Sequence, residues 1–186
     1  MPSIESAKIL IIASSGFEQS ELEVPRDKLK EHGAHVTVAS PKGAAIKGWS
    51  GSDWGTEVKA DAALEEVSEA DFDAIVLPGG QINPDVLRVN DDALALIKAF
   101  HDSGKVIAAI CHAPWLLIEA GILSGRDATS YKSIKTDVKN AGANWMDQPV
   151  VCDKGIITSR NPDDLDAFVG KIVEEIEEGS HKRDAA

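Results

Sequence analysis

The sequence of 186 residues lacks several features that mark large classes of protein. Its two cysteines, Cys111 and Cys152, are too few for the disulfide framework of a secreted domain. No apolar run approaches the roughly 18 residues of a membrane-spanning helix. The first residues have neither the basic segment nor the length of apolar segment of a secretory signal. We therefore expect a cytoplasmic protein with reduced thiols and no membrane contact.

Positive charge is also scarce, since 19 Lys and Arg stand against 31 Asp and Glu, a formal net charge of -12. Nucleic acids bind basic surfaces, so a nucleic acid is not an expected partner. Aromatic residues make up only 5%, which predicts a mainly aliphatic core. The length suits one domain. We predict a single domain over residues 1–178 and a disordered tail over residues 179–186.

Four apolar segments, at residues 8–13, 35–40, 72–80 and 106–110, alternate with segments of helical pattern. Strands that are apolar throughout are buried on both faces, which is typical of parallel sheets covered by helices. A hairpin-like excursion is expected at residues 41–64, and a second hairpin at residues 149–159. The sequence therefore predicts an α/β sandwich with a mostly parallel central sheet and helices on both faces.

Binding sites of such sheets form beyond the carboxyl ends of the strands. "ICHAPW" lies there, with Cys111 ending an apolar strand and a helix expected directly afterwards. That pattern is typical of a nucleophile elbow, in which the thiol faces a helix N-terminus that stabilises a thiolate. From the residues alone, Cys111 is either such a nucleophile or a small buried residue. His112 would orient or activate the thiol, although adjacent side chains often point in different directions.

Two other segments end strands at the same edge of the sheet. Glu18 follows the first strand and would contact the thiol as an acid or base, or merely favour a helix dipole. Nothing local distinguishes Glu21 or Glu23. The main-chain N–H groups of Gly79 and Gly80 would form an oxyanion hole, unless the turn simply needs positive φ.

No other pattern indicates a ligand. Cys152 lies in a predicted hairpin strand and is expected to be structural. No spacing of His, Cys, Asp and Glu resembles a metal site, and neither a Walker loop nor GxGxxG occurs. We therefore expect no metal and no cofactor.

Five segments, in order, carry a resemblance to a known family: "GFEQSEL", "DAIVLPGG", "AAICHAPWLLIEAGIL", "TSYKSIKTDVKNAGANWMD" and "ITSRNPDDLDAF". Together they resemble the PfpI family of intracellular proteases and protein deglycases, in the class I glutamine amidotransferase-like superfamily. The resemblance extends from about residue 8 to residue 178. It implies a flavodoxin-like sandwich with a nucleophile elbow, working as a homodimer or a larger homo-oligomer.

The resemblance also implies roles for single residues. It makes Cys111 the nucleophile, His112 its neighbour and Glu18 the glutamate that contacts the thiol. In peptidase-like members, an acid of the adjacent subunit, in a Pro-acidic pair after the PGG turn, orients the histidine. Pro84 and Asp85 match that pair after a one-residue length difference, with Asp in place of Glu. The late His-x-Glu of true glutamine amidotransferases is absent, so glutaminase activity is not expected.

Three functions remain open at this point. The first is a stress-response enzyme of glyoxalase III or deglycase type, whose Cys111 forms a hemithioacetal with methylglyoxal, glyoxal or their early adducts on amines. The second is an intracellular cysteine peptidase of PfpI type. The third is a redox-sensing stress protein or chaperone that uses an oxidisable Cys111. All three depend on the same thiol.

Overall fold

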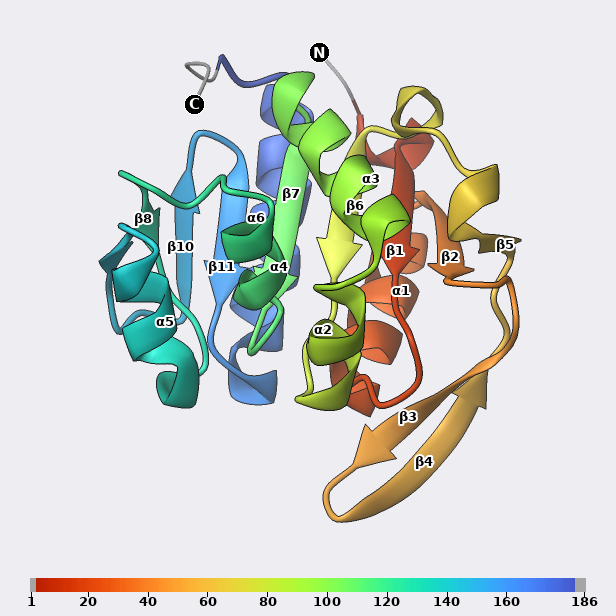
Figure 1. Ribbon diagram of the computed structural model, residues 1–186. Coiled ribbons are helices and arrows are strands. Elements are labelled where there is room, and N and C mark those ends of the chain that lie inside the picture. Colours follow the sequence, from red (N-terminus) through yellow and green to blue (C-terminus); the bar gives the residue numbers. More distant parts are fainter. Residues whose placement is uncertain (1–2, 183–186) are drawn as a thin grey trace.

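Seven strands form the central sheet of a computed structural model that describes residues 3–182 (Figure 1). In sheet order they are β10 (Val150–Asp153), β11 (Ile156–Ser159), β7 (Val106–Ile110), β6 (Ala74–Leu77), β1 (Lys8–Ile12), β2 (His35–Ser40) and β5 (Ala62–Ala63). Neighbouring strands are parallel except β10 and β11, which form an antiparallel hairpin at one edge. The chain winds outward from β1 in both directions, so the carboxyl ends of β1 and β6 flank the point where ligands bind in such sheets.

Helices cover both faces of the sheet (Figure 1). One face carries α1 (Gln19–Glu31) and α6 (Leu165–Glu178), and the other carries α2 (Ile82–Leu87), α3 (Asp91–Asp102), α4 (Pro114–Glu119) and α5 (Lys135–Asn140). The core is divided accordingly. Ile9 and Ile11 belong to the apolar cluster with α1 and α6, whereas Leu10 and Ile12 belong to the cluster with α3 and α4. The predicted three-layer sandwich is confirmed.

Two predicted segments are confirmed as hairpins, residues 41–64 by β3 (Ile46–Ser50) and β4 (Asp53–Val58) and residues 149–159 by β10 and β11. The strands β3 and β4 extend beyond the carboxyl edge of the sheet (Figure 1). A small pair, β8 (Asp127–Ala128) with β9 (Asn144–Trp145), lies beside the edge strand β10 (Figure 1). The helix after Cys111 ends at Glu119, because Gly121 turns the chain with a φ of 74°.

Residues 179–182 of the predicted tail lie within the described residues and contact the domain. Gly179 reverses the chain with a φ of 93°, and the His181 N–H donates to the Gly104 carbonyl at 2.9 Å. Residues 183–186 of that prediction lie outside the described residues.

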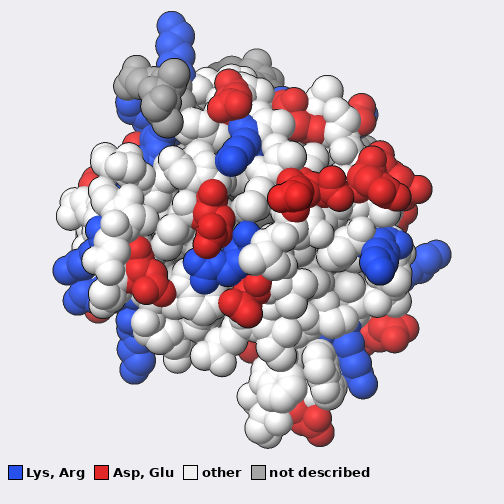
Figure 2. Space-filling model, in the orientation of Figure 1, with Lys and Arg blue, Asp and Glu red and all other residues white. Residues whose placement is uncertain are grey.

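Charged side chains of both signs are mixed on the face shown in Figure 2, where Lys and Arg form no broad continuous area. Among residues 3–182, no helix has the length and hydropathy that crossing a membrane requires.

Candidate active site

Cys111 occupies a strained turn directly after β7. Its φ is 65°, in the left-handed region that costs a residue with a side chain about 1–3 kcal/mol. Main-chain hydrogen bonds hold this conformation, since the Cys111 N–H donates to Ser159 at 3.0 Å and its carbonyl accepts from Tyr131 at 2.9 Å. Pro114 then begins α4, where its missing N–H costs nothing. The predicted elbow geometry is therefore present in the backbone.

His112 contacts the thiol of its sequence neighbour. Its Nδ1 lies 3.1 Å from Cys111 Sγ, and its Nε2 lies 3.1 Å from Ser133 Oγ. The ring stacks on Tyr131 and meets Trp115 edge-on, with centroid distances of 4.9 and 5.3 Å. Burial lowers the pKa of the imidazole, so the neutral form dominates at pH 7. We assign the Nε2 proton to the Ser133 contact, which leaves the Nδ1 lone pair facing the thiol.

The carboxyl group beside the thiol belongs to Glu21, which corrects the prediction that Glu18 contacts it. Glu21 is fully buried, accepts a hydrogen bond from the Gly79 N–H at 2.9 Å and is hydrogen-bonded to Cys111. Glu18 immediately precedes α1, and its carboxylate is directed to Ser20 Oγ at 3.5 Å. The difference arises because Glu21 lies on the core-facing side of α1, whereas Glu18 lies at the pocket rim.

The titration of Glu21 and Cys111 is coupled because the two groups share one buried hydrogen bond. Burial, and the nearby charge of Glu18, raise the pKa of Glu21 to about 8. At pH 7 the Glu21 carboxyl therefore carries a proton and can donate it to the sulfur. Burial and an ionised Glu21 raise the pKa of the Cys111 thiol, while the N–H groups of Gly80 and His112 lower it. Protonation of Glu21 removes the repulsion and favours the thiolate.

The N–H groups of the two predicted oxyanion-hole glycines have different partners. The N–H of Gly79 is already used by Glu21, so it is not free for a substrate oxygen. A Cβ at Gly79 would lie 2.5 Å from Glu21 Oε2 and 2.6 Å from Cys111 Cβ, so only glycine fits there. The N–H of Gly80 is directed toward Cys111 Sγ. The expectation of a shared oxyanion role is thus corrected for Gly79, whose N–H positions a carboxyl group.

A cavity of about 500 Å³ opens above the thiol. The β3–β4 hairpin forms one wall, because the Trp49 N–H on β3 donates to the Phe17 carbonyl at 2.7 Å. The lining residues are Gly16, Glu18, Glu21, Trp49, Gly51, Gly80, Gln81, Ile82, Cys111, His112, Tyr131 and Pro162. No Lys or Arg is among the described residues that line it, so the cavity offers no counter-charge for an anionic ligand.

Asp85 does not join the site within one chain. It is exposed on α2, close in sequence to the lining residue Ile82, whereas Ser133 contacts the outer nitrogen of His112.

Sequence reasoning missed Glu21, Ser133 and Tyr131. One pattern could have revealed Glu21, because positions 21, 22, 25 and 29 form the buried stripe of α1. A carboxylate on such a stripe is rarely buried without a specific partner. No comparable pattern marks Ser133, whose place depends on the chain path after α4.

The fold and the site together define an α/β sandwich protein with a buried cysteine, histidine and glutamate at a sharp turn between a strand and a helix. The chain belongs to the DJ-1/PfpI family, whose sequence model matches residues 7–175.

Similar proteins cover nearly the whole chain. Protein/nucleic acid deglycase 2 of Escherichia coli is 44% identical over 165 residues, which is 88% of this chain and 94% of that protein. General stress protein 18 of Bacillus subtilis is 44% identical over 163 residues, covering 87% and 92%. The crystal structure of Drosophila melanogaster DJ-1beta superposes with a TM-score of 0.83 at 34% identity, covering 93% of this chain and 95% of that one.

Proposed function

We propose that this chain is a cysteine-dependent deglycase that acts on methylglyoxal or glyoxal and on their early adducts with amines. The observation that carries the proposal is the position of Cys111 Sγ, 3.1 Å from His112 Nδ1 and hydrogen-bonded to the buried Glu21. A thiol between a base and a proton donor suits addition to an aldehyde. The similarity to a protein named as a deglycase supports the same substrate class.

In the proposed first step, His112 Nδ1 accepts the thiol proton and Sγ attacks the aldehyde carbon of methylglyoxal. A C–S bond forms, and the aldehyde oxygen takes a proton from Glu21, giving a hemithioacetal. With an amine adduct as substrate, the C–S bond forms while the C–N bond breaks. The amine then leaves with a proton supplied by the same groups, so the modified side chain or base is restored.

In the proposed second step, the ionised Glu21 removes the hydrogen on the former aldehyde carbon while the protonated His112 gives its proton to the ketone oxygen, which forms an enediol. Glu21 then returns its proton to the neighbouring carbon as the hydroxyl on the sulfur-bearing carbon gives up its proton to His112. The product is a thioester of lactate on Cys111. Water hydrolyses the thioester, which releases lactate and regenerates the thiol. Methylglyoxal and one water are thereby converted to lactic acid, without a change in the oxidation state of the protein.

The charge of the cavity favours neutral or cationic substrates. Glu18 at the rim supplies a negative charge, the protonated Glu21 at the base is neutral at pH 7, and Trp49 and Tyr131 supply aromatic walls. A glycated arginine or lysine fits this environment better than a phosphorylated or carboxylated molecule.

The test is lactate release from Nα-acetylarginine that has been pre-treated with methylglyoxal and freed of excess reagent. We expect lactate to form well above the rate of a protein-free control, together with recovery of unmodified arginine. A rate equal to the control would contradict the proposal. Fluorogenic peptides, assayed in parallel after removal of trace proteases, test the peptidase alternative, which would hold if peptides alone were turned over.

We propose further that Ser133 positions His112 within each chain, in place of the expected Asp85 of the partner subunit in a homo-oligomer. Ser133→Ala should lower kcat about tenfold and leave KM nearly unchanged, because Nε2 loses the contact that fixes the tautomer. Ser133→Thr, which retains a hydroxyl, should recover much of the loss. Asp85→Asn should stay within twofold of the wild type. A loss in Asp85→Asn alone would instead favour orientation by the adjacent subunit.

A further inference from the structure

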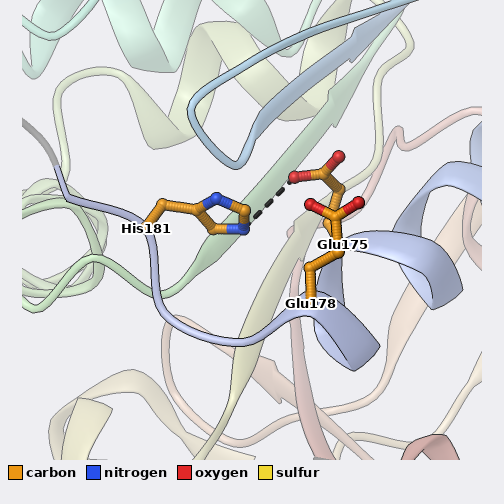
Figure 3. A group of neighbouring side chains, drawn as sticks. All are labelled: Glu175, Glu178 and His181. Atoms are coloured by element: carbon orange, nitrogen blue, oxygen red, sulfur yellow. Dashed lines mark ion pairs between the residues drawn. The ribbon is translucent and has the colours of Figure 1, made fainter. Parts of the chain in front are cut away.

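We propose that the end of α6 and the segment after it form a binding site for a divalent transition-metal ion such as Zn²⁺, with Glu175, Glu178 and His181 as ligands. One ligand atom from each residue lies within 4.8 Å of the other two. The imidazole of His181 is turned toward the two carboxylates, which project from the last turn of α6 (Figure 3). One imidazole and two carboxylates are a donor set that Zn²⁺ accepts.

The contact between His181 and Glu175 has the spacing of two ligands on one ion. The Nε2 and Oε2 atoms are 3.2 Å apart, yet the buried Nε2 makes no hydrogen bond of ordinary geometry with any described residue. Two atoms that each bind a tetrahedral Zn²⁺ at 2.0–2.2 Å lie about 3.3–3.6 Å from one another. The observed separation is close to that edge of a coordination tetrahedron.

The main chain places His181 in this position. The His181 N–H donates to the Gly104 carbonyl at 2.9 Å, in the turn before β7. The ring lies against Gly155 in the β10–β11 turn, where an added Cβ would be 2.2 Å from His181 Cδ2. A ring fixed between two turns of the sheet has little conformational freedom to lose when it binds an ion.

The surroundings of Glu175 resemble the outer shell of a metal site. Its side chain is 8% exposed, with Oε1 3.7 Å from Lys171 Nζ and a hydrogen bond from the Cys152 thiol. Such partners orient a ligating carboxylate. Glu178 is exposed, so an ion can enter from solvent and keep a water ligand.

This site is separate from the proposed active site. Gly104 precedes β7 and Cys111 follows it, so the two lie at opposite ends of one strand. A bound ion would fasten the C-terminal segment to α6 and to the β10–β11 turn. The three proposed ligands are three positions apart in the sequence. This spacing did not predict a metal site, because His181 lies beyond the end of α6.

The experiment is calorimetric titration of the metal-free full-length protein with ZnCl₂. We expect one Zn²⁺ per chain, with the site retained in Cys111→Ser, which removes the thiol at the other end of β7. His181→Gln and Glu178→Gln should each weaken binding at least about tenfold, because loss of even an outer-shell partner costs 10–100-fold. Zn²⁺ should raise the Tm of the wild type but not that of His181→Gln.

Glu177→Gln is the matched control, because it removes the same charge from an exposed neighbour on the same turn. It should bind as tightly as the wild type. Co²⁺ should give the visible bands of a tetrahedral site without a thiolate charge-transfer band, which separates this ligand set from one that includes Cys152. Equal weakening by Glu177→Gln and Glu178→Gln, or loss of all binding in Cys111→Ser, would overturn the proposal.

Discussion

Replacement of Cys111 by alanine should abolish lactate release from methylglyoxal adducts, a loss of at least about 1,000-fold in kcat. The reason is that the proposed route passes through a C–S bond at every stage, and no other thiol of the described chain lines the cavity. Cys111→Ser should be nearly as inactive, because a hydroxyl in the same turn is far less acidic than a thiol. The measurement is the rate of lactate formation by each purified variant at a saturating concentration of the methylglyoxal adduct.

Cys152→Ser provides the matched control for the loss of a thiol. Cys152 lies on β10 and does not line the cavity, and burial together with Glu175 raises its pKa to about 12. This variant should keep activity within twofold of the wild type. Equal activity of the Cys111→Ala and wild-type proteins would show that the chemistry occurs elsewhere.

Glu21→Gln should lower kcat by about 10² to 10⁴, the usual contribution of a positioned acid or base, whereas Glu18→Gln should cost less than tenfold. Both changes remove one carboxylate from the same cavity, so their difference isolates the contact with Cys111. Glu18→Gln also removes a negative charge that raises the pKa of Glu21, so the small loss expected in this variant can arise through Glu21. Comparable losses in the two variants would indicate that the charge of the cavity matters and the contact does not.

Chemical denaturation of the wild type and of Glu21→Gln between about pH 4.5 and pH 8 tests the raised pKa of Glu21 without an activity assay. The pKa of Glu21 rises from an ordinary 4.5 to about 8 on folding, so the folded state binds this proton more tightly. The wild type should therefore lose stability as pH rises from about 4.5 to about 8, as a buried carboxylate has to form. Glu21→Gln cannot ionise at this position, and its free energy of unfolding should decline less over the same range.

The central parallel strands of the fold could be predicted because they contain continuous apolar runs. Residues 9–13 and 106–110 supply apolar side chains to both faces of the sheet, a pattern that a strand needs only when both faces are covered. The elbow could be predicted as well, since Cys111 stands between such a strand and Pro114. These features depend on local sequence, where pattern and structure correspond closely.

The contacts of the thiol could be predicted only in part. Glu18 and Glu21 are three positions apart, and the packing of α1 against the sheet decides which of them reaches Cys111. Ser133 reaches His112 through a segment with no regular pattern, so tertiary structure alone brings them together. The position of His181 could not be predicted from the sequence either, because it depends on two distant turns that contain Gly104 and Gly155.

The left-handed backbone conformation of Cys111 suits glycine better than cysteine, whereas the proposed chemistry requires cysteine. Glycine adopts a φ of 65° without strain, so a library screened only for abundance should tolerate Cys111→Gly. The same library screened for survival under carbonyl stress should reject that variant completely. Position 111 is therefore where the two screens should disagree most, and a related chain with glycine there should fold but lack the proposed chemistry.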